Sequence, residues 1–254
     1  KDLGGDAFAI PGDLTKPANV TAVFEAAKHR FGGIDIAVNT TGKVLRKPIV
    51  DTTEEDFDSM FDINAKAAFF FIKEAGIHLN DGGKIITIVT SLLAAFTDGY
   101  STYAGGKAPV EDFTRAAAKE FGRRGISVNA LGPGPMDTPF FYGQETPERV
   151  AYHKSQSMNG ELTKIEDIVP IVKFLATGGW WMTGQTIVSV RRTHLDRPPE
   201  SADTGEHGIT TKHGRDSADP GAVSSKRRVA TGVLPPKRDG PQHAWTLPPA
   251  ESET

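Results

Sequence analysis

Strand patterns and helix patterns alternate along residues 1–190, and this alternation constrains the fold more than any other feature of the chain. Short apolar or β-branched runs, which predict strands, lie at residues 6–13, 34–42, 83–91, 126–134 and 182–190. Helical spacing of apolar residues occupies the intervals 17–32, 53–79, 101–125 and 164–179. We therefore predict an α/β fold with a doubly wound parallel sheet, in which ligands bind at the carboxyl ends of the strands.

The composition changes sharply near residue 190. All 14 Phe and all 4 Tyr precede it, whereas residues 191–254 contain a single aromatic residue, Trp245, and 8 of the 17 Pro. A segment so poor in apolar side chains cannot bury enough surface to offset the entropy that it would lose on ordering. We predict one folded domain at residues 1–190, followed by a disordered tail at residues 191–254.

Charge and cysteine content exclude several classes of function. The net charge of -3 gives no indication of a nucleic acid or an anionic membrane as partner. The absence of Cys excludes disulfides, zinc–thiolate sites and cysteine nucleophiles, and we expect no metal site. No apolar run approaches the ~20 residues that span a membrane. No leader precedes Lys1, so we expect a cytoplasmic protein. The sequence begins with Lys and not with Met, so we expect it to be incomplete.

Polar and turn residues follow the predicted strands, where the ends of parallel strands meet at one edge of the sheet. They are Asp13, Asn39 to Gly42, Ser91, and Pro133 to Thr138, and the helices add Asn64, Tyr103 and Lys107. Tyr103 and Lys107 in "YAGGK" are four residues apart, which places both side chains on one face of a helix. A cation one helical turn away favours a phenolate, so Lys107 is expected to lower the pKa of Tyr103 from its usual ~10.

Five of these segments together resemble the short-chain dehydrogenase/reductase family over about residues 5–188. They are "NTTG" (39–42), Asn64 in "DINAKAAFFF", Ser91 in "ITIVTS", "YAGGK" (103–107) and "PGPMDT" (133–138). The resemblance implies a Rossmann-like fold and an NAD(P)-dependent oxidoreductase that acts on an alcohol or carbonyl compound.

The resemblance also implies a role for each matching side chain. Tyr103 would act as general acid and base, and Lys107 would tune it and hold the nicotinamide ribose. Ser91 would donate a hydrogen bond to the substrate oxygen, and Asn64 would hold a water of the proton relay. The alternative for Tyr103 is an ordinary half-buried aromatic residue. Tyr100 has Ala104, not Lys, four residues later, and is not expected to take its place.

The cofactor implied is NAD or NADP, without a choice between them. Asp13 matches the family's adenine-contacting carboxylate, although it is also interpretable as a turn or capping residue before Pro17. Asn39 and Gly42 match the family's Asn-Asn-Ala-Gly turn, from which Thr40 and Thr41 depart. The remaining cofactor contacts implied by the resemblance are Tyr103, Lys107, Pro133, Gly134 and Thr138.

The substrate side is expected around residues 140–162, where the family has a mobile lid. Phe140, Phe141, Tyr142 and His153 are candidates for a pocket lining, or alternatively for packing of a lid helix. Leu92 and Leu93 are candidates for an apolar wall. The resemblance further implies a homodimer or homotetramer, formed through the segments 53–79 and 101–125 and the last strand.

One element of the family's pattern is not found in the sequence. The turn Thr-Gly-x-x-x-Gly-x-Gly, which holds a pyrophosphate at a helix N-terminus, does not occur in residues 1–254. The tail after residue 190 is also atypical of the family. We therefore interpret the fold as an N-terminally truncated Rossmann-like sheet. The alternative function is an inactive fragment that acts at most in binding or subunit interaction, and that would give no nicotinamide fluorescence change.

Overall fold

The computed structural model describes residues 7–95 and 97–190, and every structural statement below concerns these residues. The predicted C-terminal tail lies outside them, so its predicted disorder stays a prediction. The first six residues and Phe96 also lie outside the described part of the chain.

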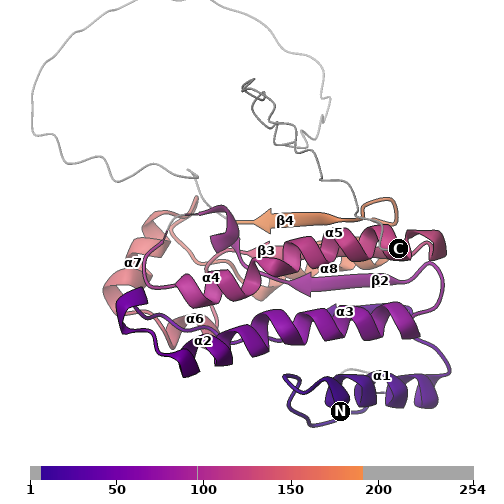
Figure 1. The fold of residues 1–254 in the computed structure, drawn as a ribbon. Coiled ribbons are helices and arrows are strands. Elements are labelled where there is room, and N and C mark those ends of the chain that lie inside the picture. Colours follow the sequence, from indigo (N-terminus) through magenta and orange to yellow (C-terminus); the bar gives the residue numbers. More distant parts are fainter. Residues whose placement is uncertain (1–6, 96, 191–254) are drawn as a thin grey trace, which may run out of the picture. The chain divides into compact units, whose positions relative to one another are not determined.

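Four parallel strands form the sheet, in the order of the sequence (Figure 1). They are β1 (Ile36–Asn39), β2 (Lys84–Ile88), β3 (Ser127–Pro133) and β4 (Gln185–Ser189). The register aligns Ile36 with Lys84, Lys84 with Ser127, and Asn129 with Gln185. The predicted α/β class with a parallel sheet is confirmed.

Helices cover both faces of this sheet. On one face, α3 (Ala67–His78) packs between α1 (Pro17–Phe31) and α5 (Pro109–Phe121), and α5 lies on β3. Helix α8 (Ile165–Thr177) packs on β2 and β3 behind the sheet in Figure 1. All seven residues of β3 are buried, which is the burial expected of an inner strand with both faces covered.

One strand prediction needs correction, and one predicted strand is only partly buried. Residues 7–12 form no strand and are exposed, because no described strand lies beside them to pair with their backbone. The side chains of strand β1 alternate between exposed and buried. Ile36 is 44% exposed and Val38 38% exposed, since none of the described helices covers the face to which they point.

The predicted helix over residues 53–79 is interrupted once. It consists of α2 (Glu54–Phe61), a π-helical turn η2 (Asp62–Lys66) and α3. Thr53 caps its start, and Thr53 and Asp56 form a reciprocal capping box. The π-helical turn contains Asn64, which is fully buried. Such turns are frequent at functional sites, because the extra residue redirects side chains.

Thr53 gives a direct test of this helix start. Its Oγ1 accepts a hydrogen bond from the backbone N–H of Asp56 at 3.2 Å. We expect Thr53→Ala to lower the free energy of unfolding by about 1 kcal/mol, the usual cost of a lost N-cap. Thr177→Ala is the matched control, since that hydroxyl donates only to Lys173 O within its own helix. Equal urea midpoints for Thr53→Ala and the unmodified chain would contradict the prediction.

The predicted helix over residues 101–125 is two helices, α4 (Ser101–Lys107) and α5. The break falls at Pro109, whose ring removes the N–H that a continuous helix needs. Two shorter helices, α6 (Pro139–Tyr142) and α7 (Pro147–Ser155), lie in the predicted lid. The 3-10 turns are η1 (Ile49–Asp51), η3 (Ser91–Ala94) and η4 (Gly122–Arg124).

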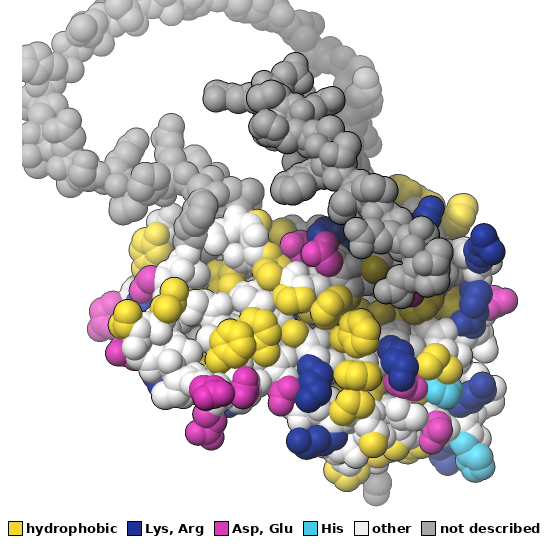
Figure 2. Space-filling view, viewed as in Figure 1, with side chains coloured by type: hydrophobic (Ala, Val, Ile, Leu, Met, Phe, Trp, Pro, Cys, Tyr) yellow, Lys and Arg dark blue, Asp and Glu magenta, His cyan; other side chains and the backbone are white. Residues whose placement is uncertain are grey.

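Hydrophobic side chains gather on the outer face of the helical layer (Figure 2). Phe57, Phe69 and Ile77 are 46–57% exposed there, on α2 and α3. The predicted oligomer contacts fall partly on these helices and stay a prediction. Within the described residues, none of the helices combines the length and the apolar character required to cross a membrane.

Candidate active site

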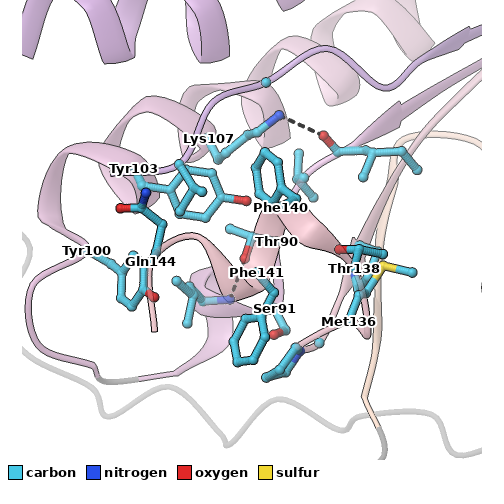
Figure 3. Close-up of a pocket in the computed structure, with 18 of the residues that line it drawn as sticks. Thr90, Ser91, Tyr100, Tyr103, Lys107, Met136, Thr138, Phe140, Phe141 and Gln144 are labelled. Carbon is cyan, nitrogen blue, oxygen red and sulfur yellow. Dashed lines mark hydrogen bonds between the residues drawn. The ribbon is translucent and has the colours of Figure 1, made fainter. Parts of the chain in front are cut away.

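A cavity of about 250 Å³ lies at the carboxyl ends of β1, β2 and β3, where the sheet topology predicts a ligand site (Figure 3). Helix α4 forms one wall, and the segment that contains α6 and α7 (residues 139–155, here the α6–α7 segment) forms another. Seven of the predicted site residues line it: Gly42, Ser91, Tyr103, Lys107, Pro133, Gly134 and Thr138. Asp13, Asn39 and Asn64 do not line it.

Helix α4 presents Tyr103 and Lys107 to the same cavity, as their spacing predicts. Tyr103 is 7% exposed and Lys107 is 4% exposed. The Lys107 ammonium donates hydrogen bonds to the backbone carbonyls of Thr41 (3.1 Å) and Ile88 (3.0 Å). Two of its three hydrogens are therefore engaged, and they tie α4 to the ends of β1 and β2.

Burial governs the ionisation of both groups. It raises the pKa of Tyr103, an effect that the nearby Thr90 hydroxyl only partly offsets. It also lowers the pKa of Lys107 to about 8. The expected lowering of the Tyr103 pKa by Lys107 is thus wrong for this structure, because desolvation disfavours the phenolate more than the local environment favours it. The buried phenol is held in its protonated form at neutral pH.

The glycines around this pair allow a close approach. A Cβ on Gly106 would lie 3.1 Å from Met60 O and 3.3 Å from the Asn64 Cβ. A Cβ on Gly42 would lie 3.0 Å from both Lys107 Nζ and Asn64 Oδ1. The second glycine of "YAGGK" therefore lets α4 pack directly on the π-helical turn.

Asn64 fixes the loop after β1 and is not directed into the cavity. Its Oδ1 accepts from the backbone N–H of Lys43 at 3.2 Å. Its Nδ2 donates to the carbonyls of Lys43 (2.9 Å) and Met60 (3.0 Å). The side-chain amide thus binds the backbone of two segments, which leaves the predicted water relay untested.

Two adjacent hydroxyls follow β2, and the one nearer to Tyr103 is not the predicted one. Thr90 and Ser91 both line the cavity and are 6% and 5% exposed. The Thr90 hydroxyl is close enough to the Tyr103 phenol to lower its pKa, and Figure 3 shows Thr90 beside the phenol, with Ser91 farther away. Thr90 Oγ1 also accepts from Leu92 N at 3.3 Å, which orients it. The sequence signal was available, because a Thr directly precedes Ser91 at the strand end.

The remaining predicted cofactor contacts shape turns. Asn39 is 2% exposed, and its Oδ1 accepts from Thr41 N at 2.9 Å. Asp13 is exposed, and its Oδ1 accepts from the N–H (2.9 Å) and the hydroxyl (2.7 Å) of Thr15, in the manner of a turn residue. That geometry is the alternative interpretation of Asp13 and does not test a contact with adenine.

The substrate side is lined mostly by apolar and aromatic groups. Of the candidates from the sequence, Leu92, Phe140, Phe141 and His153 line the cavity. Tyr142 does not line it and instead donates to Asp137 Oδ1 at 2.7 Å. Leu93 packs in the core against Ala68 and Val89, among others.

Glu145 also lines this side, although no pattern in the sequence indicates it. Its side chain is 1% exposed although it belongs to a link between two short helices. Its carboxylate accepts a hydrogen bond from the Tyr100 hydroxyl at 2.5 Å. Glu145 differs from other acidic residues only in having a buried partner far away along the chain, and the local sequence does not show that partner.

The nicotinamide half of a dinucleotide fits the groups present. The side-chain Nδ2 of Asn39 is buried and has no partner among the described residues. A hydrogen-bond donor is therefore available at the end of strand β1. Gly42 lets the backbone approach Lys107 so closely that a Cβ would lie 3.0 Å from its Nζ. Pro133, Gly134 and Thr138 line the opposite wall. Together these residues provide a closely approachable backbone, a hydroxyl group and one cation. A ribose and a carboxamide can form hydrogen bonds with such groups.

Residues 1–189 match a family model described as enoyl-(acyl carrier protein) reductase. A protein of Arabidopsis thaliana, the chloroplastic NADPH-dependent aldehyde reductase-like protein, is 37% identical over 190 residues, which are 72% of this chain and 70% of that protein. The short-chain type dehydrogenase/reductase of Picea abies is 33% identical over 189 residues, again 72% and 70% of the two chains.

The solved structures agree with these relatives. A Burkholderia cenocepacia protein, crystallised with bound NADP, is similar with a TM-score of 0.72 and 56% identity over 75% of each chain. Some fungal relatives are matched over only about half of their length (52%).

Proposed function

Because the chain belongs to the short-chain dehydrogenase/reductase family of oxidoreductases, we propose that it transfers a hydride between a nicotinamide cofactor and the carbonyl or alcohol group of a small molecule, with Tyr103 as general acid and base. One observation carries this proposal. The Tyr103 phenol and the Lys107 ammonium are buried in one cavity, at the edge of the sheet where ligands of such folds bind.

Reduction is the direction that the ionisation of the site favours. Burial raises the pKa of Tyr103, so the phenol carries its proton at neutral pH and donates it to the substrate oxygen as that oxygen gains charge. The Thr90 hydroxyl, which lies near the phenol, stabilises the same oxygen. The ammonium of Lys107 adds positive charge nearby, since its pKa of about 8 leaves it largely protonated at neutral pH.

The cofactor would be held by Gly42, Lys107, Pro133, Gly134 and Thr138. When bound, its nicotinamide ring supplies the hydride that the protein cannot supply itself. NADPH is the form proposed, because NADP is bound in the Burkholderia structure and the Arabidopsis relative is named as NADPH-dependent.

The substrate proposed is an uncharged, largely apolar carbonyl compound. Its end of the cavity is walled by Val44, Leu92, Met136, Phe140 and Phe141. Lys107 is the only Lys or Arg among the described residues of the lining, and its ammonium donates to two backbone carbonyls. An anionic substrate would therefore lose its hydration without gaining an ion-pair partner.

The test is ketone-dependent oxidation of NADPH, followed by absorbance. We expect turnover of acetophenone, an uncharged aryl ketone, and at least ~10-fold lower kcat/KM for phenylglyoxylate, which carries a carboxylate beside the same ketone. A preference for the keto acid would contradict the proposed substrate class. The absence of turnover with any aldehyde or ketone would contradict the proposed activity.

A catalytically silent chain is the second candidate, and one observation favours it. Residues 1–254 contain no glycine-rich pyrophosphate-binding turn. If these residues act alone, NADPH should bind too weakly to change its fluorescence. Saturable enhancement of NADPH fluorescence by the 254-residue chain would exclude this candidate.

The two hydroxyls after β2 can be distinguished by substitution. Thr90→Val removes the hydroxyl near Tyr103 and keeps the side-chain shape. We expect it to lower kcat about 10²-fold, the cost of one donor at a charged oxygen. Ser91→Ala is the comparison, with an expected loss below about 10-fold. The reverse order in steady-state assays would restore Ser91 to the role that the family resemblance implies.

A further inference from the structure

Glu145 is a buried carboxylate that the proposed chemistry does not use. It lies between α6 and α7, and its side chain is only 1% exposed. A buried charge is retained in a folded protein only where partners compensate its lost hydration. Glu145 lies in the cavity wall on the substrate side, so the contacts that compensate its charge can affect the substrate side of the cavity.

Three side chains from two elements meet this carboxylate. The Tyr100 hydroxyl donates to Oε1 at 2.5 Å, and His153 Nε2 lies 3.4 Å from the same oxygen. Arg149 Nε donates to Oε2 at 2.8 Å. Burial alone would raise the pKa of Glu145, but the hydrogen bonds from Tyr100 and Arg149 outweigh burial and lower that pKa. Glu145 is therefore ionised and fully engaged at neutral pH.

The contact with Tyr100 crosses from the α6–α7 segment to the helix that carries the proposed general acid. Tyr100 is the N-cap residue of α4, three residues before Tyr103, and the two rings pack with centroids 6.2 Å apart. Tyr100 is itself 6% exposed. The hydrogen bond therefore fixes the α6–α7 segment to the same turn of α4 that presents the phenol.

A second set of contacts extends from the same point. Arg149 Nη2 lies 3.3 Å from Asp98 Oδ1, and Asp98 Oδ2 pairs with Arg46 at 2.8 Å. The backbone N–H of Arg46 donates to Gln144 Oε1 at 3.0 Å. Residues 46, 98 and 144–149 are far apart in sequence, so these bonds join two loops to the α6–α7 segment. Glu145 is the most buried charge among them.

The aromatic wall of the cavity depends on where this segment lies. Phe140 packs on Tyr103 with ring centroids 6.3 Å apart, and Phe141 packs on His153 at 5.3 Å. Figure 3 shows the Phe140 ring beside the Tyr103 side chain. Few core contacts hold this segment, since α6 and α7 contain no buried residue. Its polar anchor must therefore supply much of its order.

We infer that Glu145 is a positioning residue, whose carboxylate anchors the α6–α7 segment to Tyr100 and so holds Phe140 and Phe141 against the substrate. The inference rests on the proposed function only in one respect, namely that the aromatic wall formed by Phe140 and Phe141 contacts the substrate. Removing the carboxylate takes the charged partner from the Tyr100 hydroxyl and leaves Arg149 only its contact with Asp98, which frees the segment while the sheet keeps its own contacts.

Hydrogen exchange of the 254-residue chain tests the anchor without any turnover. In Glu145→Gln, we expect amides of residues 139–155 to exchange about 10-fold faster or more, the effect of losing one hydrogen bond to a charged group. Amides of β2 and β3 should be unchanged. Glu148→Gln is the matched control, because Glu148 is an exposed Glu in the same segment. Unchanged exchange in Glu145→Gln would overturn the inference, whatever the protein catalyses.

Two further variants separate positioning from general stability. Tyr100→Phe should speed exchange in the same residues, and the double variant should add little to Glu145→Gln, because both remove one interaction. Glu145→Asp should restore part of the protection. Additive effects of the two substitutions would overturn the proposed bond as the anchor.

The kinetic readout connects the anchor to the substrate. With acetophenone and NADPH, Glu145→Gln should raise KM about 10-fold and change kcat less than about 3-fold, since the substrate wall is lost and the proton donor is kept. An equal KM would overturn the positioning role even if exchange rises. If no ketone is turned over by the unmodified chain, the proposed function fails, and the exchange result still decides the anchor.

Discussion

Tyr103→Phe is expected to lower kcat/KM for ketone reduction by about 10²–10⁴-fold, the range for loss of a general acid. The substitution removes only the hydroxyl that lies near Thr90. The ring keeps its contacts with Tyr100 and Phe140, at centroid distances of 6.2 and 6.3 Å. Since packing is retained, the unfolding midpoint should change little, and the loss should reside in the chemical step. Steady-state NADPH oxidation measures it.

The control for Tyr103→Phe is Tyr142→Phe. Tyr142 is 40% exposed, and its hydroxyl bonds Asp137, outside the cavity lining. This variant should retain the activity of the unmodified protein. The affinity for NADPH should be the same in both variants, because neither removes a charge from the cavity. Activity of Tyr103→Phe within about threefold of the unmodified protein would exclude the phenol from proton transfer.

The sheet and its helices were predictable because their apolar periodicity is local. The β-branched run around Ile85 and the helical spacing of Val20 and Phe24 both appear as buried positions. Residues 6–13 were predicted as a strand on the same kind of signal, but a strand also needs a neighbour that pairs with its backbone. No pattern within a segment reports whether that neighbour is present.

The π-helical turn and the break at Pro109 show a related limit. Apolar spacing over residues 53–79 indicates helix throughout, and the extra residue at Asp62–Lys66 is decided by packing. Gly106 and Asn64 meet there across two helices, so closely that a Cβ added to Gly106 would lie 3.3 Å from the Asn64 Cβ. That contact joins residues more than 40 positions apart, so spacing alone does not predict it.

The candidate site was predictable where its residues share a helix or a strand end. Tyr103 and Lys107 are four residues apart, and their common face follows from helix geometry. Thr90 and Ser91 are adjacent, and only the tertiary structure decides which hydroxyl meets the phenol. Glu145 is bound by Tyr100, 45 residues away, and so has no local signature.

Ionisation in the site was the least predictable property, because burial sets it. Spacing indicates that Lys107 and Tyr103 are neighbours, and neighbouring charge alone would lower the phenol pKa. Burial instead raises the pKa of Tyr103 and lowers that of Lys107. The degree of desolvation depends on the Gly106 contact, the β1 turn and the α6–α7 segment together.

The depressed pKa of Lys107 leads to the second large effect, a stability that rises with pH. The pKa of Lys107 is about 8 in the folded protein and 10.5 in its unperturbed state. Between these values the unfolded chain binds more protons, so the free energy of unfolding increases with pH. Below about pH 8 the whole penalty for burying the charge is present, and above about pH 10.5 it is absent.

Lys107→Met isolates this contribution, since Met has a similar length and no charge. The quantity to measure is the unfolding free energy of the unmodified protein minus that of Lys107→Met. We expect this difference to increase by about 3 kcal/mol between pH 7.5 and pH 10.5, in favour of the unmodified protein. The value is an order of magnitude, taken from the ~1.4 kcal/mol of one pKa unit. Other groups that titrate in this range, Tyr100 and Tyr103 among them, are present in both proteins and cancel in the difference. Urea unfolding at both pH values measures it. A difference independent of pH would mean that Lys107 keeps an ordinary pKa in the folded protein. Some interaction other than its two carbonyl partners would then compensate the burial of its charge.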